Sequence, residues 1–412
     1  MSLRTLMFGW EYPPKHSGGL GVACQGLVRG LLKQNVAVTL VLPSSVDTGS
    51  DDVDLRHPGS DLFSSITVKS GLQPYDSLHT YAARMGSLPL PLSELYGPDL
   101  GSAVERYTAM SVELTKDVQP DVVHCHDWMT LEAGIRASRH HRRPLVAHVH
   151  ATELDRTHFR PNEWIALRER NGLLQADKVI AVSNYTKSIL TKYYGIPGDR
   201  IAVIHNGHDP HRTHITPCVI SKTGSAKRPL VLFLGRLTVQ KNPWQFLEIA
   251  TKVRQLNPSV QFVMAGDGSM LPELIDRACE LGLGDNMVFA GKVSNREALS
   301  LYAAADCFVM PSVSEPFGLV ALEAIAHGTP VIVSKQSGVS EVLDHAFKVD
   351  YWDSDKMADC ILTILREEPL AQQLRSEAPR LLQRLSWQNQ AGKVHSIYHD
   401  LIQSNSILHS TI

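Results

Sequence analysis

Residues 312–324 read SVSEPFGLVALEA, and this stretch decides the predicted fold. The apolar run Cys307–Met310 directly before it predicts a buried strand, and an apolar helical pattern begins near Phe317. The first turn of such a helix carries free N–H groups that can hold a phosphate. Glu315 lies just before the helix start, and Glu323 lies two turns into the helix. The pattern predicts an anion-binding turn with two carboxylates that can accept hydrogen bonds from sugar hydroxyls.

A plainer interpretation accounts for only one of these carboxylates. Glu315 can complement the dipole of the helix without binding any ligand. Glu323 differs because it lies on a strongly apolar helix, LVALEAIA, where a buried carboxylate needs a partner.

Short apolar runs alternate with helical patterns on both sides of this stretch, which predicts parallel α/β sheets. The runs are almost continuously apolar, as strands buried on both faces are. The expected strands are Thr5–Phe8, Val36–Leu42, Val122–His124, Leu145–Val149, Lys178–Val182, Ile201–Ile204, Leu230–Leu234, Gln261–Ala265, Met287–Ala290, Cys307–Met310 and Pro330–Val333. The helices expected between them include Ala23–Gln34, Leu131–Ser138, Trp244–Gln255, Leu271–Leu281 and Arg296–Ala304.

The alternation stops once, which divides the chain into two α/β domains. Residues 1–208 form the first domain, 209–229 a linker and 230–386 the second domain. A last helix, 387–407, either packs back on the first domain or covers the second sheet, and the sequence leaves both alternatives open. Residues 44–101 show no regular pattern and are expected to carry insertions or a loop.

The composition excludes several classes of protein. The chain has 412 residues, a net charge of −2, 43% hydrophobic and 20% charged residues, which argues against disorder and against a basic nucleic-acid-binding surface. Six cysteines without a CxxC pair indicate a reducing compartment rather than a zinc ribbon. No apolar run reaches the roughly 18–20 residues of a membrane span, and the first apolar stretch resembles a buried strand rather than a signal peptide. We expect a cytoplasmic location, with peripheral membrane contact left open.

Cations and glycines follow the strands of the second domain. Arg236 and Lys241 lie after the strand Leu230–Leu234, and together they suit a diphosphate, although surface cations in a loop would give the same pattern. Gly266 lies in a Gly-Asp-Gly turn after the next strand, where it is expected to shape the pocket.

The first domain offers weaker candidates. Gly18 and Gly19 lie in a glycine-containing loop before a helix, which fits either an anion site or a tight turn. His150 ends the strand Leu145–Val149, where a satisfied structural histidine is the plainer alternative. His126 and Asp127 end another strand in HCHDW, and the HxH spacing shows no third metal ligand in the sequence. The sequence therefore predicts no metal.

Seven segments together resemble the retaining glycosyltransferases of the group 1 type (family 4), relatives of glycogen and starch synthases. They are FGWEYPPKHSGGLG, HCHDW, HVHATELDR, AVSNYTK, VIHNGHD, GRLTVQKN and SEPFGLVALEA, which span residues 8–324. The resemblance implies a GT-B fold of two Rossmann-like domains whose parallel sheets face an interdomain cleft. It also implies that a nucleotide-sugar donor is held mainly by the second domain and that the first domain lies on the acceptor side.

The resemblance also implies individual roles, residue by residue. Arg236 and Lys241 would bind the donor diphosphate, Glu315 the sugar hydroxyls and Glu323 the ribose. Further roles would fall to Phe317, Gly318 and Leu319 (backbone N–H groups around sugar and phosphate), His150 (the sugar near the reacting carbon), Gly18 and Gly19 (the diphosphate) and His126 and Asp127 (the acceptor side). Such enzymes generally need no metal or other cofactor, because Arg and Lys replace the cation on the leaving group.

Two departures from the family pattern stand out. Lys15 is separated from Gly18 by two residues, whereas the glycogen and starch synthases usually have Lys directly before Xaa-Gly-Gly. Residues 337–341, SGVSE, lack the Gly-Gly that many relatives carry before the corresponding Glu.

The function that the resemblance implies is transfer of a hexose, glucose as the first expectation, from a nucleotide sugar with retained configuration. The donor base and the acceptor, whether saccharide, glycan or lipid-linked, stay open, as does the oligomeric state. Three alternatives share parts of this pattern: a sugar-nucleotide epimerase, a phosphorolytic enzyme with a lysine-bound pyridoxal cofactor, and a non-catalytic nucleotide-sugar-binding protein.

Overall fold

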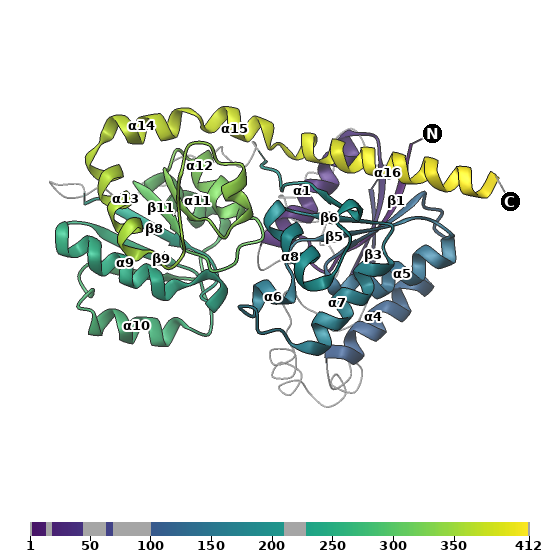
Figure 1. Cartoon of the computed structure of the whole chain (residues 1–412), viewed down its shortest axis with the longest axis horizontal. Helices are drawn as coiled ribbons and strands as arrows, with labels where there is room; N and C mark the ends of the chain where they lie inside the picture. The colour runs from purple at the N-terminus through teal and green to yellow at the C-terminus, as the bar shows by residue number, and fades with distance from the viewer. Residues whose placement is uncertain (1, 14–18, 44–62, 69–99, 210–227, 411–412) are drawn as a thin grey trace. The chain divides into compact units, whose positions relative to one another are not determined.

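The computed structural model describes residues 2–13, 19–43, 63–68, 100–209 and 228–410. The chain forms two compact units, each built on one parallel sheet (Figure 1). Unit 1 contains Met1–Glu153, Asn162–Gly207 and Trp387–Ile412, and unit 2 contains Leu154–Pro161 and His208–Ser386. The α/β class with two Rossmann-like parallel sheets is therefore confirmed.

The sheet of unit 1 has the strand order β3-β2-β1-β4-β5-β6-β7. Its strands are β1 (Arg4–Phe8), β2 (Ala37–Leu42), β3 (Phe63–Thr67), β4 (Val122–His126), β5 (Leu145–Val149), β6 (Lys178–Ala181) and β7 (Ile201–Val203). The helices of the first part of the chain are α1 (Gly19–Lys33), α4 (Leu100–Thr115), α5 (Trp128–His141), α6 (Glu153–Arg156), α7 (Glu163–Gln175) and α8 (Asn184–Tyr194). Strands β4 and β5 are buried along their whole length, which explains their continuous apolar runs.

The sheet of unit 2 has the strand order β10-β9-β8-β11-β12-β13. Its strands are β8 (Leu230–Leu234), β9 (Gln261–Ala265), β10 (Met287–Gly291), β11 (Cys307–Met310), β12 (Val331–Ser334) and β13 (Phe347–Val349). Its helices are α9 (Pro243–Leu256), α10 (Leu271–Glu280), α11 (Asn295–Ala304), α12 (Leu319–Ala326), α13 (Ser354–Arg366), α14 (Glu368–Ser376) and α15 (Ala378–Arg384). Helices α9, α10 and α13 pack on the sheet in one apolar core that includes Phe246 and Phe262.

In both sheets the strand order reverses beside the first strand, between β1 and β4 and between β8 and β11. Ligands of open parallel sheets bind outside the carboxyl ends of the strands at such a reversal. The segments that follow these strands are therefore the places where the fold positions functional side chains.

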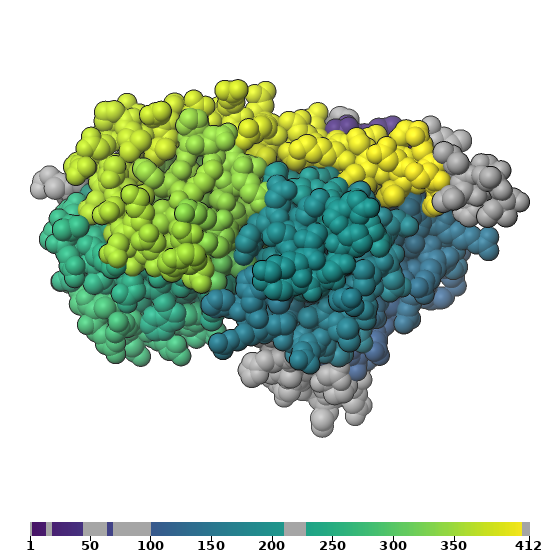
Figure 2. Space-filling model, viewed as in Figure 1, coloured from purple at the N-terminus to yellow at the C-terminus, as the bar shows by residue number. Residues whose placement is uncertain are grey.

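The last helix, α16 (Trp387–Ser410), packs on α1 within unit 1. Trp387 is buried, and a Cβ at Gly26 would lie 2.1 Å from its ring, while a Cβ at Gly30 would lie 2.6 Å from Ala391 Cβ. These two glycines of α1 let the helices approach closely. Figure 2 shows the yellow α16 lying along the surface of this unit. Of the two alternatives for the last helix, the structure has the packing on the first domain.

Three features of the structure differ from the sequence prediction. Strands β3 and β13 were not expected, because both lie at sheet edges and Ser64, Ser65 and Thr67 of β3 are exposed. Helix α12 begins at Leu319, two residues later than expected. Residues 154–161 group with unit 2 rather than with a continuous first domain, and within that unit Ser314 Oγ donates to Asp155 Oδ1 at 2.5 Å.

Some predicted features lie outside the described residues, namely most of the 209–229 linker and most of the irregular 44–101 region. No helix in the described ranges combines the length and the apolar character needed to cross a bilayer.

Candidate active site

Two loops of unit 2 carry an ion pair at the carboxyl ends of β8 and β11. Lys241 lies in the short 3-10 turn Val239–Lys241 and pairs with Glu315, which precedes α12. Ser312 Oγ also donates to Glu315 Oε2, at 3.3 Å. The side chains of Lys241 and Glu315 are only 18% and 8% exposed, so the pair is largely withdrawn from solvent. Because an ammonium has three donors, Lys241 can hold Glu315 and still donate to an anion.

The two loops are also fixed to each other through the backbone. Gln240 Nε2 donates to the carbonyl of Ser314 at 3.0 Å, and the N–H of Val313 donates to the carbonyl of Gln240 at 2.9 Å. Asn242 Nδ2 donates to the carbonyl of Pro311 at 3.2 Å. The ion pair therefore lies on a preorganised support, as electrostatic catalysis requires.

Helix α12 begins beside this pair, in a conformation that needs glycine. Gly318 is the N-cap, with a φ of 105°, and a Cβ there would lie 3.0 Å from Met310 Cε and 3.2 Å from Val339 Cγ1. Phe317 is buried, and its carbonyl accepts from the N–H of Val339 at 2.7 Å. Leu319 then opens the helix, so the N–H groups of its first turn are presented next to Glu315.

The SGVSE segment supports the same turn. The N–H of Glu315 donates to the carbonyl of Gln336 at 3.0 Å, and the N–H of Gly338 donates to the carbonyl of Glu315 at 2.9 Å. This segment lacks the Gly-Gly pattern but forms a short parallel β-bridge between Ser337 and Glu315. The bridge fixes the backbone of Glu315.

The carboxylate of Glu323, on an otherwise apolar helix, has a hydrogen-bond partner. Its side chain is half-buried, and Tyr302 Oη of α11 donates to Glu323 Oε2 at 3.1 Å. Burial, together with the Glu323 carboxylate, raises the pKa of Tyr302 well above its usual value, so the phenol stays protonated as the donor. Sequence reasoning missed Tyr302, since no spacing rule links a residue on α11 to one on α12.

Gly266 shapes the loop that carries Arg236. Its φ is 144°, and a Cβ there would lie 1.8 Å from the carbonyl oxygen of Gly235. The N–H of Gly235 donates to the carbonyl of Ala265 at 3.0 Å, and the N–H of Leu237 donates to the carbonyl of Asp267 at 2.9 Å. The half-buried Arg236 lies between these two anchored residues.

In unit 1, the residues after β4 and β5 are tied together. His126 Nδ1 and His150 Nε2 share a hydrogen bond of 2.9 Å, and both rings are buried. Asp127 Oδ1 accepts from the N–H of His150 at 2.7 Å and from the N–H of Ala151 at 3.3 Å. Asp127 itself has a φ of 55°. This buried carboxylate therefore fixes the backbone of His150.

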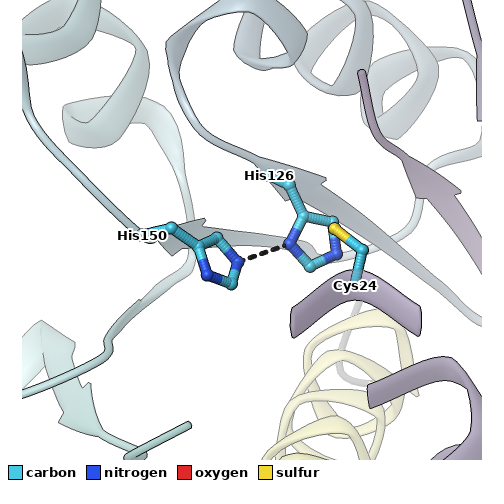
Figure 3. A group of neighbouring side chains, drawn as sticks. All are labelled: Cys24, His126 and His150. Atoms are coloured by element: carbon cyan, nitrogen blue, oxygen red, sulfur yellow. Dashed lines mark hydrogen bonds between the residues drawn. The ribbon is translucent and has the colours of Figure 1, made fainter. Parts of the chain in front are cut away.

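The histidines are more numerous than the HxH motif indicated. His148 of β5 lies beside His126 in register, and the ring centroids of His126 and His148 are 5.3 Å apart. Cys24 of α1 also lies near His126 and His150 (Figure 3). The prediction that no third metal-ligand candidate accompanies the HxH pair is wrong, because the candidates come from a neighbouring strand and from a helix far away in sequence.

The glycines predicted in the first domain are only partly described. Gly18 and Lys15 lie outside the described residues, whereas Gly19 is the exposed first residue of α1.

Comparison with known proteins decides the family. Residues 220–381 match the model of glycosyl transferases group 1, and residues 17–212 match that of glycosyltransferase family 4. The glycogen synthase of Mycobacterium tuberculosis is 30% identical over 96% of this chain and 94% of its own length. The chain belongs to the group 1 glycosyltransferases. This group 1 glycosyltransferase is also 29% identical to an uncharacterized glycosyltransferase of Methanocaldococcus jannaschii, over 96% of this chain and 98% of the relative.

Solved structures support the fold of this glycosyltransferase. The sucrose-phosphate synthase of Thermosynechococcus elongatus matches with a TM-score of 0.77 at 20% identity, over 98% of this chain and all of that one. Anabaena HepE in complex with UDP and glucose matches with a TM-score of 0.72 at 22% identity, over 97% of this chain and all of that one. The GT-B relationship expected from the motifs is thereby confirmed.

Proposed function

We propose that this glycosyltransferase moves a hexose, with glucose as the first candidate, from a nucleoside diphosphate sugar to a saccharide acceptor and retains the anomeric configuration. The observation that carries the proposal is the Lys241–Glu315 pair beside the first turn of α12. A cation and a helix N-terminus suit a diphosphate, and a buried carboxylate suits sugar hydroxyls. The complex of HepE with UDP and glucose supports this choice of donor.

In the proposed reaction, the bond between C1 of the sugar and the β-phosphate oxygen breaks, and negative charge develops on the leaving diphosphate. Arg236, Lys241 and the N–H groups of the first turn of α12 stabilise that charge. The acceptor hydroxyl forms the new bond to C1 on the same face, and its proton passes to the departing phosphate oxygen. This step needs no enzymic nucleophile.

The remaining roles follow from the family pattern and the local geometry. Glu323, oriented by Tyr302, would accept from the ribose hydroxyls. His150 would contact the donor sugar, while His126 and Asp127 would hold His150 in place rather than contact the acceptor. Gly266 would act through the loop of Arg236, and Gly18 and Gly19 would approach the diphosphate from the first domain.

A product assay tests the proposal. The full chain is incubated with UDP-, ADP- or GDP-glucose and with malto-oligosaccharide, glucose phosphate or lipid-linked acceptors, and products are identified by mass and by the NMR coupling at the new anomeric centre. We expect one base to support formation of an α-linked product. Conversion of the donor to its epimer without transfer, or a β-linked product, would contradict it.

A further inference from the structure

Three side chains converge at one edge of the sheet of unit 1. The proposed reaction gives them no joint role. Cys24 comes from α1, His126 ends β4 and His150 follows β5, and one ligand atom of each lies within 4.8 Å of the others. Figure 3 shows the sulfur of Cys24 beside the ring of His126, with the rings of His126 and His150 joined by the hydrogen bond. All three residues are buried, and His150 alone of the three is measurably exposed, at 9%.

The donor set and its spacing suit a zinc ion. Zinc is bound by thiolate sulfur at about 2.3 Å and by imidazole nitrogen at about 2.0–2.1 Å, so tetrahedral donors lie roughly 3.3–3.6 Å apart. The present spacings reach this range with movements of about 1.5 Å or less. One thiolate and two imidazoles form a set of borderline softness, which favours Zn²⁺ over Mg²⁺ or Ca²⁺.

The charges around the site favour a cation. The carboxylates of Glu11 and Asp127 interact electrostatically with the sulfur of Cys24. Both carboxylates are themselves buried, so their negative potential at the sulfur is weakly screened. These buried carboxylates also attract a metal ion, and together with the thiolate they supply three negative charges, one more than the +2 of the ion.

His126 adds an independent observation. The ring of His126 is fully buried. Its Nε2 atom is fully buried and has no hydrogen-bond partner among the residues that the structure describes. An unpaired buried nitrogen of this kind costs about 1–3 kcal/mol, and a Zn–N bond to Nε2 removes that cost.

A second histidine group nearby is less suited to a metal. His124, His126 and His148 also lie within 4.8 Å, but the rings of His124 and His126 stack with centroids 4.6 Å apart and 19° between planes. The lone pairs of stacked rings run side by side and do not converge on one point. In addition, His124 Nδ1 already shares a hydrogen bond with Tyr398 Oη.

We propose that Cys24, His126 and His150 bind Zn²⁺ and that the bound ion inhibits sugar transfer. On binding, the Cys24 thiol releases its proton and a Zn–S bond forms. The hydrogen bond between His126 and His150 breaks, and its proton stays on the ring nitrogen that does not bind the ion. Two Zn–N bonds form, and water completes the coordination. The inhibition rests on the proposed function of His150 as a donor-sugar contact, whereas the metal site itself does not.

Metal binding is tested first, on the full chain and without any substrate. The protein is stripped with EDTA, titrated with Co²⁺ as a spectroscopic substitute and then with Zn²⁺, and bound metal is counted after gel filtration. Wild type should bind one equivalent with a cobalt–thiolate charge-transfer band, and C24A should lack the band and bind at least about 10-fold more weakly. Cys125→Ala is the matched control, because Cys125 is equally buried but its sulfur packs against Gly134.

The outcomes separate the two parts of the proposal. An unchanged band and affinity in folded C24A, or no bound metal in wild type, overturns the site. If the site stands, stoichiometric Zn²⁺ should lower turnover by at least about 10-fold in wild type and in C125A but not in C24A, and EDTA should restore it. Metal bound at Cys24 without loss of turnover overturns the inhibition. Absence of turnover in metal-free protein contradicts the proposed function and leaves the metal count to decide the site.

Discussion

The carboxyl edges of the two sheets have the same topology but opposite chemistry. In each sheet the strand order reverses beside the first strand, and the candidate residues follow the strands at that reversal. Unit 2 places charged groups there, Lys241 and Glu315, beside a helix N-terminus. Unit 1 places buried imidazoles there, His126 and His150, on a backbone fixed by Asp127.

The comparison shows that the fold determines where a site lies, while the residues determine what it can bind. The edge of unit 2 has the charges to hold a diphosphate and to stabilise its departure. At the edge of unit 1 the buried carboxylate of Asp127 accepts from backbone N–H groups, so it orients side chains rather than holding an anion. Substitutions that remove individual groups from one edge or the other test this difference.

The largest effect is expected from Lys241→Ala. Loss of the cation at the leaving group should lower kcat by about 10²–10³-fold, the range found when one preorganised donor is removed. Lys252→Ala is the matched control, because Lys252 forms an ion pair with Asp355 in the same unit but away from these loops. Steady-state rates with the donor identified by the product assay provide the readout.

Stability must be separated from activity in this variant. K241A leaves the buried Glu315 without its cation, at a cost of about 3–5 kcal/mol. The double variant Lys241→Met with Glu315→Gln removes both charges and should recover much of the thermal stability while staying inactive. An active double variant would show that this pair only supports the fold.

Asp127→Asn tests whether unit 1 positions His150. An amide can still accept one hydrogen bond but loses the charge, so kcat should fall about 10-fold with little change in KM. Asp177→Asn is the matched control, because Asp177 accepts from the N–H of Leu145 at the opposite end of β5. Equal losses of kcat in both variants would show that Asp127 only stabilises the fold and does not position His150.

Gly318→Ala tests the preorganised start of α12. The positive φ alone costs a non-glycine residue about 1–2 kcal/mol, and contact with Met310 and Val339 adds to it. Gly328→Ala separates the two effects, since Gly328 has a φ of 77° with open space around its Cβ position. The thermal shift produced by the donor should shrink in G318A and persist in G328A. Equal donor shifts in the two variants would contradict the role of Gly318.

The last effect concerns stability rather than activity, through pH and the buried histidines of unit 1. Burial holds the pKa values of His124, His126 and His148 below their usual value. Below pH 6.5 the unfolded chain gains protons that the folded chain excludes, so the free energy of unfolding should fall by up to about 1.4 kcal/mol per pH unit for each histidine. Above pH 6.5 this contribution is constant.

Thermal unfolding between pH 7.5 and 5.0, with EDTA present, measures this dependence. His148→Leu should flatten the fall in the unfolding midpoint, whereas the exposed control His140→Gln should retain it. An unchanged slope in H148L would show that the buried rings do not govern stability in this range.

The sequence predicted the sheets because their central strands are short apolar runs buried on both faces. It missed β3 and β13, whose edge positions leave little apolar pattern. The packing of α16 on α1 depends on Gly26 and Gly30 lying under Trp387, a contact between residues more than 350 positions apart.

The candidate site was predictable where adjacent residues share one turn, as Glu315 and Gly318 do. It was not predictable where partners come from separate elements. Tyr302 for Glu323, and Cys24 and His148 beside His126, are brought close only by the crossing of strands and helices. Local spacing therefore located the site, and tertiary packing determined its partners.

The most direct test of the central claim is calorimetric titration of the nucleoside diphosphate sugar into wild type, K241A and K252A, without metal. We expect K241A to bind the donor at least about 100-fold more weakly, a loss of about 2.7 kcal/mol, and K252A to bind it as wild type does. Equal affinity in all three proteins would contradict the claim that the charged edge of unit 2 holds the donor diphosphate.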